Sequence, residues 1–395
     1  MINFDEAVAL IRGVAVPVGR ESIALEVAAG RVLATPVIAR IDSPRNDVSA
    51  MDGYAVRSAE LGSGPVSLKI VGGSLPGEGW AGKLGSGECA RIFTGAPVPN
   101  GADRVIVQEI VRREGDMANF DATATGSTNI RRRGGDFAIG EELLPAGRRL
   151  DPRALVAAAA ADVDRLDLFR RPRVQIISTG DELVEPGTAA IQDNAIPESA
   201  SFGVAALAED WGARVEGRLR LSDDLAQLKS AAERALANAD LVIVTGGASV
   251  GERDFAKSMF DDAGLKLIFS KVDIKPGKPV WLGRVGDTIV IGLPGNPTSA
   301  LVTARLFLAP VLAGITGRTI EDALQWRRLP LATPLPACGQ RETFHRARSV
   351  SGAAEILSFQ DSSAQKVLAE ADLLVRQPAN TQALEVGSIA DVLDF

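Results

Sequence analysis

Residues 174–182 are VQIISTGDE and residues 241–247 are LVIVTGG. Each segment is a mostly apolar run with the length of a buried strand, and each ends in a glycine-containing turn. Such runs alternate with helical patterns, for example near residues 199–211 and 224–238. This alternation predicts an α/β domain at residues 172–324, with a mostly parallel sheet covered by helices on both faces.

Three further parts are predicted around this domain. Short apolar runs between glycine- and proline-rich turns are typical of a β-rich insert. Asp151 and Pro152 have the N-cap and first-turn positions of a helix start. We expect the alanine-rich helix that follows to pack against an amphipathic helix at residues 1–14. The predicted parts are an elongated helical stem of residues 1–45 with 141–171, the β-rich insert of residues 46–140, and a small C-terminal β-barrel of residues 325–395.

The composition argues against several classes of protein. A net charge of −7 does not suit a general binder of nucleic acid or of membrane surfaces, which would present a basic face. Cys89, Cys338 and His345 are the only cysteines and histidine, too few for a Cys/His zinc site or a disulfide framework. The sequence predicts neither a signal peptide nor a membrane span. We therefore expect a cytoplasmic protein, in which any bound metal is a hard ion on carboxylates.

Four loops near the ends of the predicted strands are rich in glycine, proline and charged residues. They are residues 179–182 (TGDE), 245–251 (TGGASVG), 274–279 (IKPGKP) and 292–297 (GLPGNP). Ligands of open α/β sheets bind at the carboxyl ends of the strands, so we expect the four loops to meet there. One such loop alone is more often a plain turn, but four together favour a site for an anion and a metal. No Walker-type motif is present and no Gly-x-Gly-x-x-Gly follows a strand, which argues against a P-loop NTPase or a dinucleotide oxidoreductase.

The residue types in these loops fit that chemistry. Backbone N–H groups of a glycine turn before a helix bind anions, and lysines add positive charge. Glu182 and Asp254 offer hard oxygen ligands for Mg²⁺, which commonly bridges phosphate oxygens. Asn296 is placed to cap the helix that follows it. The candidate substrate-binding residues in these loops are Gly180, Asp181, Gly246, Gly247, Ser249, Gly251, Lys275 and Lys278.

Taken together, the motifs resemble the MoeA and gephyrin E-domain family. The four loops match the family in order and spacing, and segments outside the sheet domain agree independently. The resemblance covers essentially the whole chain. The additional matching segments are SAMDGYA at 49–55, TGAP at 94–97, GAD at 101–103, residues 131–140 around Asp136, residues 341–347 and residues 371–378.

The resemblance implies an elongated, four-part homodimer that acts in molybdenum cofactor biosynthesis. The implied reaction takes molybdate and adenylylated molybdopterin, which the preceding enzyme of the pathway supplies. It releases molybdenum cofactor and AMP in a Mg²⁺-dependent step. Chaperones of molybdoenzymes are further partners that such a role would admit. A site of this kind must gather like charges, which requires N–H groups, lysines and a metal rather than a His or Cys nucleophile.

The family pattern also implies roles for individual residues. From the insert, Asp52, Thr94 and Asp136 would act in the cleft of the other subunit, although a turn residue or a strand end is the alternative interpretation for the first two. One of Asp223 and Asp224 would act in the sheet domain, and a helix N-cap is the alternative for either. The other implied site residues are Glu182, Glu198, Ser199, Asp254, Lys275, Lys278, Pro294, Asn296 and Pro297.

Two segments depart from the family pattern. Glu198-Ser199-Ala200 stands where the family has Asp-Ser-Asn, so the amide expected to contact ligand is absent and the upstream Asn194 is the available substitute. Gly134-Gly135-Asp136 replaces Gly-Glu-Asp. A catalytically weak carrier of pterin or molybdate, or a scaffold for molybdoenzyme maturation, is therefore the alternative to the enzyme.

Overall fold

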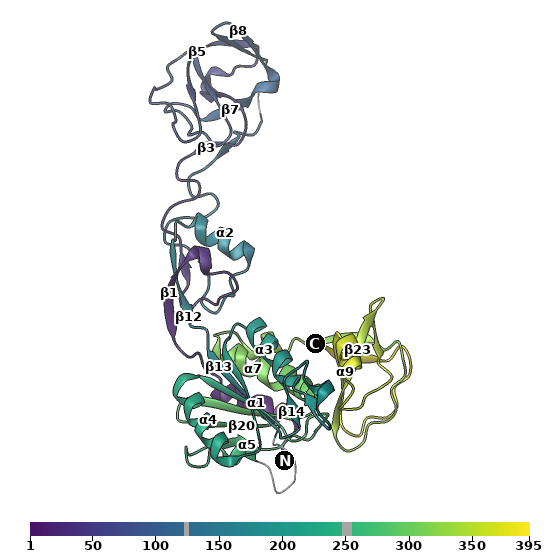
Figure 1. Cartoon of the computed structure of the whole chain (residues 1–395). Coiled ribbons are helices and arrows are strands. Elements are labelled where there is room, and N and C mark those ends of the chain that lie inside the picture. The colour runs from purple at the N-terminus through teal and green to yellow at the C-terminus, as the bar shows by residue number, and fades with distance from the viewer. Residues whose placement is uncertain (122–125, 247–254) are drawn as a thin grey trace.

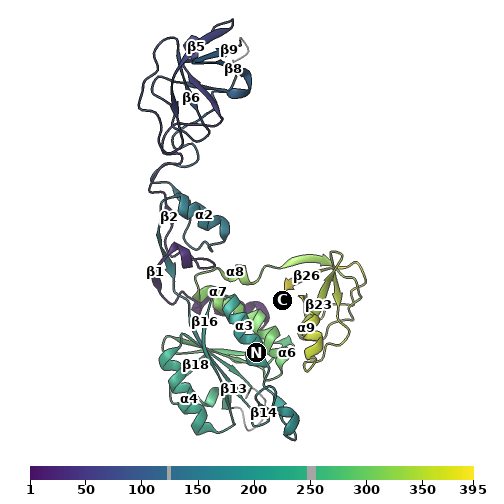
Figure 2. The ribbon, with the colours of Figure 1, turned by 45° about the horizontal axis from the view of Figure 1, so that its top comes forward.

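The computed structural model describes residues 1–121, 126–246 and 255–395. The chain is elongated: a β-rich insert forms one end, a narrow stem follows, and a sheet domain lies beside a C-terminal domain at the other end (Figures 1 and 2). The chain enters the insert through the stem and returns through it, so stem and insert are separated from both chain ends (Figure 1).

A six-stranded sheet forms the centre of the sheet domain. Its strand order is β16-β13-β17-β21-β20-β18. The first four strands are parallel, whereas β20 pairs antiparallel with both β21 and β18. The predicted mostly parallel sheet is confirmed. The strands are β13 (Arg173–Thr179), β16 (Arg214–Leu221), β17 (Leu241–Thr245), β18 (Lys266–Phe269), β20 (Trp281–Val285) and β21 (Thr288–Leu293).

Both faces of this sheet are covered, because side chains alternate between the faces along each strand. Val174 and Ile176 belong to one hydrophobic core and Ile177 to the other. A 19-residue helical segment, Pro297–Ile315, is long and apolar enough to cross a membrane, but 94% of it is buried inside the structure, as in a core helix. One face is covered by α3 (Ala200–Asp210), α6 (Pro297–Thr303), α7 (Ala309–Ile315) and α1 (Phe4–Val14), and the other by α4 (Leu225–Asn238) and α5 (Phe255–Ser258).

The amphipathic N-terminal helix is confirmed as α1, but its expected packing against the alanine-rich helix is wrong. Its buried side chains join the core of the sheet domain and contact α7. The ring of Phe4 lies 5.7 Å from that of Phe307 and 5.2 Å from that of Phe344, which belongs to the C-terminal domain. An amphipathic pattern marks the face that is buried but does not select the partner that buries it.

The stem is mixed rather than helical in the residues that the structure describes. The predicted helix start is confirmed, because the Asp151 side chain accepts a hydrogen bond from the Ala154 N–H at 2.8 Å. The helix packs over two short antiparallel ladders and shares a core with them. These elements are α2 (Pro152–Ala160), β1 (Arg20–Ala24) with β12 (Arg165–Phe169), and β2 (Val37–Ile38) with β11 (Glu142–Leu144).

The insert and the C-terminal domain are each built on a six-stranded sheet. The insert sheet has the order β7-β4-β6-β5-β9-β8, as its turn-rich sequence predicts. A closed barrel would need strand pairing between the two edges of the C-terminal sheet. Near that closure the structure has one isolated bridge, from Leu331 to Ala354, and no continuous strand pair, so the barrel stays a prediction. The strands are β4 (Gly53–Val56), β5 (Val66–Ser74), β6 (Glu88–Ile92), β7 (Arg104–Val107), β8 (Val111–Glu114) and β9 (Met117–Phe120), then β19 (Ile274–Lys275), β22 (Arg327–Pro330), β23 (Glu342–Val350), β24 (Ala353–Ile356), β25 (Leu373–Gln377) and β26 (Ile389–Asp394).

Candidate functional site

A cleft of about 700 Å³ lies at the carboxyl ends of β13, β17 and β21. Residues from all four predicted loops line it, so the expectation that the loops meet at one edge is confirmed. The cleft also takes residues from the C-terminal domain. Its lining includes Thr179, Gly180, Glu182, Glu198, Ser199, Asp223, Gly246, Gly277, Pro279, Pro294, Asn296, Pro297, Ser299, Ser363 and Gln365.

One loop reaches the cleft for a different reason from the one expected. Residues 274–279, the lysine loop, do not follow a parallel strand of the sheet; they precede the antiparallel strand β20. Trp281 of β20 is paired with Gly292 of β21, so β20 begins where β21 ends. The start of an antiparallel strand thus brings the lysine loop to the same edge.

Close backbone packing explains the glycine at the floor of the cleft. Gly246 has φ +91°, and a Cβ at this position would lie 2.3 Å from the carbonyl oxygen of Thr179. The ends of β17 and β13 therefore approach too closely for any side chain. Beneath them the Thr245 hydroxyl donates to the Ser178 hydroxyl at 2.8 Å, in the buried interior.

Helix starts and hydroxyl groups supply hydrogen-bond donors to the cleft. Ser199 is the N-cap residue of α3 and Asn296 that of α6, so the positive ends of two helix dipoles face the same space. The hydroxyls of Thr179 and Ser199 are buried and have no hydrogen-bond partner among the described residues. The Asn296 side chain does not cap α6 as expected; its amide donates to the Ser362 hydroxyl at 3.1 Å. A buried donor at the start of α3, another at the end of β13 and the two helix dipoles form a site suited to an anion.

Lys275 and Lys278 line a neighbouring cavity of about 600 Å³, the lysine pocket, rather than the cleft itself. Arg341 of the C-terminal domain also lines it, and no role was predicted for that residue. The cleft and the lysine pocket share Gly277, Pro279 and Ser299 as a common wall. An anion in each would therefore lie next to the other across this wall.

The same two lysines and Arg341 also face a third cavity, of about 580 Å³, on the C-terminal domain. His345 lines this cavity, and its Nε2 lies 2.8 Å from Oε1 of Gln377. Burial holds the pKa of His345 below its ordinary value, with the nearby Lys275 lowering it further. The imidazole is therefore neutral at pH 7 and adds no charge to the three cations.

Carboxylates of the sheet domain divide into site and structural residues. Glu182 and Asp223 both line the cleft. Asp224 is the N-cap residue of α4, and its carboxylate accepts hydrogen bonds from two backbone N–H groups. The interpretation of Asp224 as a helix cap is therefore confirmed. The Asp181 carboxylate accepts from the Asp223 N–H at 2.9 Å and fixes the loop. Gly247, Ser249, Gly251 and Asp254 lie outside the described residues.

The predicted site residues of the insert do not join this cleft within one chain. The Asp52 carboxylate accepts from the backbone N–H of Thr94 at 2.7 Å and from its hydroxyl at 2.8 Å. These bonds hold the pKa of Asp52 below its ordinary value, so the group is charged at pH 7. Asp136 is exposed on the turn between β10 (Ile130–Arg131) and β11. The insert and the sheet domain lie at opposite ends of the stem (Figure 1).

The departure at residues 198–200 has a structural solution. Glu198 is buried, and its carboxylate accepts from the Ser201 N–H at 2.8 Å and from the Ser201 hydroxyl at 2.5 Å. Ala200 is 5% exposed and belongs to the hydrophobic core. Asn194, the expected substitute amide, lies on the exposed turn before β15 (Ile196–Pro197) and is not among the described residues that line the cleft.

Family models match nearly the full length of the chain. The model for the MoeA N-terminal region, domains I and II, matches residues 2–161. A probable molybdopterin binding domain matches residues 175–314, which contain most of the cleft. The model for the MoeA C-terminal region, domain IV, matches residues 328–395.

Known proteins resemble the chain in sequence and in structure. A molybdopterin molybdenumtransferase of Haemophilus influenzae is 36% identical over 332 residues, covering 84% of this chain and 80% of that protein. Molybdopterin molybdenumtransferase 2 of Mycobacterium tuberculosis is 34% identical over 386 residues, with 95% of both chains covered. The crystal structure of a molybdopterin biosynthesis MoeA protein from Pyrococcus horikoshii superposes with a TM-score of 0.85 at 28% identity, covering 99% of this chain and 98% of that one.

Proposed function

The chain belongs to the MoeA family, and from that premise we propose that it is a molybdopterin molybdenumtransferase that inserts molybdate into adenylylated molybdopterin. It acts in molybdenum cofactor biosynthesis as a transferase on a molybdopterin substrate. In the proposed reaction the two dithiolene thiols of the pterin displace one oxide of molybdate, which leaves as water with the two thiol protons as the Mo–S bonds form. A second water cleaves the bond between the adenylate and the molybdopterin phosphate, so that molybdenum cofactor and AMP leave.

The proposal depends on one observation above all: the cleft and the lysine pocket share a wall. The reaction has two anionic substrates, and they must lie side by side although they repel each other. The donors at the starts of α3 and α6 suit the phosphates. Lys275, Lys278 and Arg341 suit molybdate, which is a compact dianion. Each anion is thereby matched by its own donors before the two are brought together.

The carboxylates in the cleft fit a divalent cation. Glu182 and Asp223 are hard oxygen donors beside the proposed phosphate position, and Mg²⁺ is commonly held by one or two carboxylates together with substrate phosphates. When bound, Mg²⁺ would neutralise charge on the phosphate that leaves with AMP. Asp181 holds the Asp223 backbone in place and so orients that loop.

We further propose that the site is completed by a second copy of the chain. Asp52 and Thr94 form a pre-organised, charged pair, yet no described residue of the cleft lies near them in the same chain. A homodimer in which the insert of one subunit reaches the cleft of the other would give this pair a function. Asp136 lies at the base of the same insert and would approach that cleft with them.

The reaction can be tested with purified protein, adenylylated molybdopterin, molybdate and Mg²⁺, with AMP release as the readout. Lys275→Ala should raise the molybdate concentration needed for half-maximal rate by about tenfold or more, because a charge-assisted hydrogen bond contributes roughly 1.5–3 kcal/mol. Lys271→Ala removes an equal charge from an exposed position that lines none of the three cavities and should leave the rate unchanged. Binding of the pterin without AMP release by the unaltered protein would contradict the proposal and favour a carrier.

A further inference from the structure

The lysine pocket is larger than molybdate alone requires. Its volume is about 600 Å³. An oxyanion with one metal and four oxygens fills only on the order of 100 Å³, since one water takes about 30 Å³ in the liquid. Pockets of roughly 300–1,000 Å³ hold ring-sized organic ligands. The space beside Lys275 and Lys278 therefore has room for a further part of the substrate.

The chemistry of the substrate indicates which part this is, and the inference here rests on the proposed function. Molybdenum becomes bonded to two dithiolene sulfurs, which lie on a ring fused to the pterin and a few bonds from the phosphate. With molybdate at the lysines, the pterin must lie at the lysine pocket while the phosphate reaches the cleft across the common wall. The adenine lies beyond the phosphates and is directed away from the lysine pocket.

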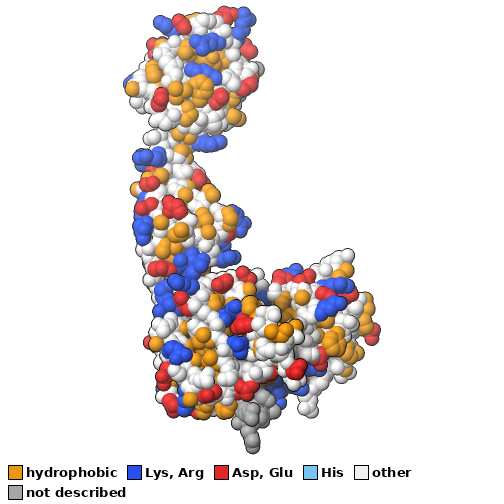
Figure 3. All heavy atoms as spheres, in the orientation of Figure 1, with side chains coloured by type: hydrophobic (Ala, Val, Ile, Leu, Met, Phe, Trp, Pro, Cys, Tyr) orange, Lys and Arg blue, Asp and Glu red, His pale blue; other side chains and the backbone are white. Residues whose placement is uncertain are grey.

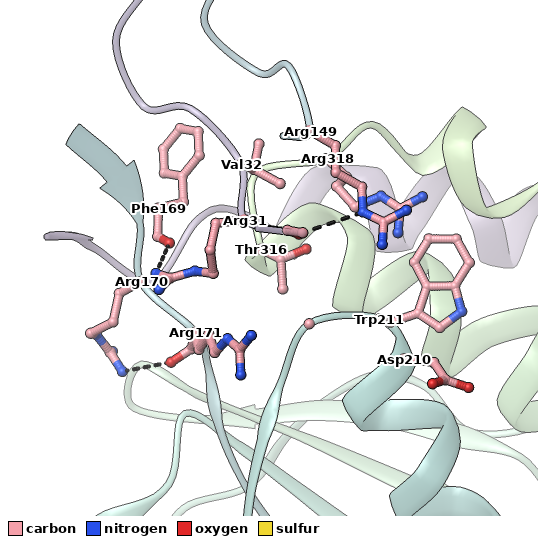
Figure 4. Close-up of a pocket in the computed structure, with 12 residues that line it drawn as sticks. Arg31, Val32, Arg149, Phe169, Arg170, Arg171, Asp210, Trp211, Thr316 and Arg318 are labelled. Carbon is pink, nitrogen blue, oxygen red and sulfur yellow. Dashed lines mark hydrogen bonds between the residues drawn. The ribbon is translucent and has the colours of Figure 1, made fainter. Parts of the chain in front are cut away.

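Two other hollows with positive charge do not fit the pterin ring. The third cavity, on the C-terminal domain, shares no described lining residue with the cleft, so a ring there would be separated from the phosphate. Lys and Arg side chains also gather where the stem meets the sheet domain (Figure 3), around the pocket shown in Figure 4. That pocket has a volume of about 20 Å³, enough for about one water, and its Arg170 is already paired with Asp240.

One segment of the C-terminal domain runs along both anion sites. Residues 359–362 line the lysine pocket, whereas Ser363 and Gln365 line the cleft. We call residues 359–365 the bridging segment. The amide of Asn296 at the start of α6 donates to the Ser362 hydroxyl at 3.1 Å and ties the segment to the sheet domain. The bridging segment is thus placed to contact the part of the substrate that spans the common wall.

Polar groups beneath the bridging segment hold it in place. Arg346 of β23 is 1% exposed, and its guanidinium group donates to the carbonyl oxygens of Phe359, at 3.4 Å, and Ala364, at 3.5 Å. The side chain of Gln360 accepts from the Arg346 N–H at 3.0 Å and donates to the Arg346 carbonyl oxygen at 2.8 Å. These contacts fix the backbone that carries Phe359 before a ligand arrives, which lowers the entropy cost of binding.

Phe359 is the exposed aromatic side chain of the bridging segment. It is 57% exposed and lines the lysine pocket. The next most exposed phenylalanine in the described part of the chain is Phe202, at 44%, and the guanidinium group of Arg218 covers it, 3.5 Å from the ring centre. No described ring or cation stacks on Phe359 in this way. The face of this ring is therefore available to a flat ligand in a pocket of matching size.

We propose that Phe359 stacks on the pterin ring of the substrate and selects for a flat heteroaromatic group beside the molybdate position. In this arrangement the dithiolene lies next to molybdate held by Lys275 and Lys278, and the phosphate reaches the donors at the starts of α3 and α6. Phe359 contacts the substrate away from the reacting atoms. It therefore contributes binding and orientation, not a chemical step.

Titration of the full-length protein with adenylylated molybdopterin, followed by the fluorescence of the pterin, tests the stacking. Phe359→Leu keeps an apolar side chain but removes the ring, and it should weaken binding about tenfold, as the loss of one stacking aromatic does. Phe359→Trp should keep the affinity, because the larger ring also stacks. Phe202→Leu is the matched control, since it makes the same change at an exposed ring that lines none of the three cavities and should leave the affinity unchanged.

AMP and molybdate separate the pterin from the other groups that bind. AMP has no pterin, so its affinity in calorimetry should be equal in the unaltered and Phe359→Leu proteins. In the AMP-release assay, Phe359→Leu should raise the concentration of adenylylated molybdopterin needed for half-maximal rate by about tenfold. The molybdate concentration needed should stay unchanged, which is the reverse of the result expected for Lys275→Ala.

Three results would overturn the stacking. Equal pterin affinity in the Phe359→Leu and Phe202→Leu proteins would show that the ring contributes nothing. A tenfold loss of AMP affinity in Phe359→Leu would place the adenine, not the pterin, on the ring. Dissociation of the dimer by Phe359→Leu would show that a second copy covers the ring.

Failure of the proposed function gives a different result. If the unaltered protein binds the pterin but releases no AMP, the transferase proposal fails, while weaker pterin binding by Phe359→Leu still supports the stacking. Absence of pterin binding by the unaltered protein would overturn both proposals.

Discussion

The proposed sharing of the site between two chains makes a prediction that can be tested by mixing variants. Asp52 lies between β3 (Val48–Ser49) and β4 in the insert, and Glu182 lies just before β14 (Leu183–Val184) beside the sheet domain. These elements are at opposite ends of the molecule (Figure 1). If both carboxylates serve one reaction, each functional site must take one from each subunit.

Asp52→Ala and Glu182→Ala should each abolish most AMP release as pure homodimers. A mixed dimer, purified by two different affinity tags after co-expression, has one site that lacks both carboxylates and one site that is intact. It should therefore release AMP at about half the rate of the unaltered dimer, because a two-fold symmetric dimer has two equivalent sites. Glu182→Ala should keep the unaltered melting temperature, because Glu182 is exposed, whereas Asp52→Ala removes two hydrogen bonds to Thr94 and should lower it slightly without unfolding the dimer.

The converse arrangement is the control. A chain carrying both substitutions, paired with an unaltered chain, places one defect in each shared site and should be inactive. If each site instead belonged to a single chain, the results would be reversed. The dimer with one substitution in each chain would be inactive, and the dimer of a doubly substituted chain with an unaltered chain would be about half active. That reversal would refute the shared site. An unchanged rate in the Asp52→Ala homodimer would remove Asp52 from the site altogether.

Three further predictions follow from the packing. Phe4→Ala should lower the free energy of unfolding by about 3–5 kcal/mol, measured by denaturant titration, because a fully buried ring joins two domains. Gly246→Ala should destabilise the protein and weaken pterin binding in calorimetry, because the new Cβ would meet the Thr179 carbonyl oxygen at 2.3 Å. Burial raises the pKa of the Cys89 thiol to about 12, so at pH 8 it should resist alkylation by iodoacetamide, whereas the partly exposed Cys338 should react, as peptide mass analysis would show.

Each of these changes has a matched control in the chain. Leu10 lies on α1 and is 40% exposed, so Leu10→Ala should change the free energy of unfolding by less than about 1 kcal/mol. Gly62→Ala adds its Cβ to open space and should be tolerated. Denatured protein should alkylate at both cysteines. Equal losses at Leu10 and Phe4, or at Gly62 and Gly246, would contradict the packing argument.

The sheet domain could be predicted because its signals are local. Unbroken apolar strands, glycine turns and the N-cap at Asp151 depend on neighbouring residues alone, and each was found where expected. The placement of α1 could not be predicted in this way. Its apolar face fits any apolar surface, and the choice between the stem and the sheet domain is made by contacts with Phe307 and Phe344, hundreds of residues away.

The candidate site divides along the same line. The loops at residues 179–182 and 292–297 follow parallel strands, so the topology rule places them correctly. The contributions of Arg341, Ser363 and Gln365 have no local signal, because the docking of the C-terminal domain brings them to the two cavities. The adjacent aspartates 223 and 224 are equivalent candidates by sequence, and only the structure distinguishes them, because Asp224 caps α4.

The unusual segment at residues 198–200 bears on whether the protein is an enzyme or a carrier. A side chain at position 200 points into the hydrophobic core at the first turn of α3, so alanine there suits the packing. Glu198 takes over the stabilisation of that turn through Ser201, which in turn accepts from Arg218 at 3.1 Å. Among the residues that the structure describes, the Ser199 hydroxyl has no partner at the cleft. The segment thus keeps a rigid helix start and a free donor facing the proposed phosphate, which are what transfer chemistry requires of it. The replaced amide alters one contact with the ligand and leaves the anion site itself in place, so the departure favours an enzyme with adjusted substrate contacts over a carrier that has lost its site.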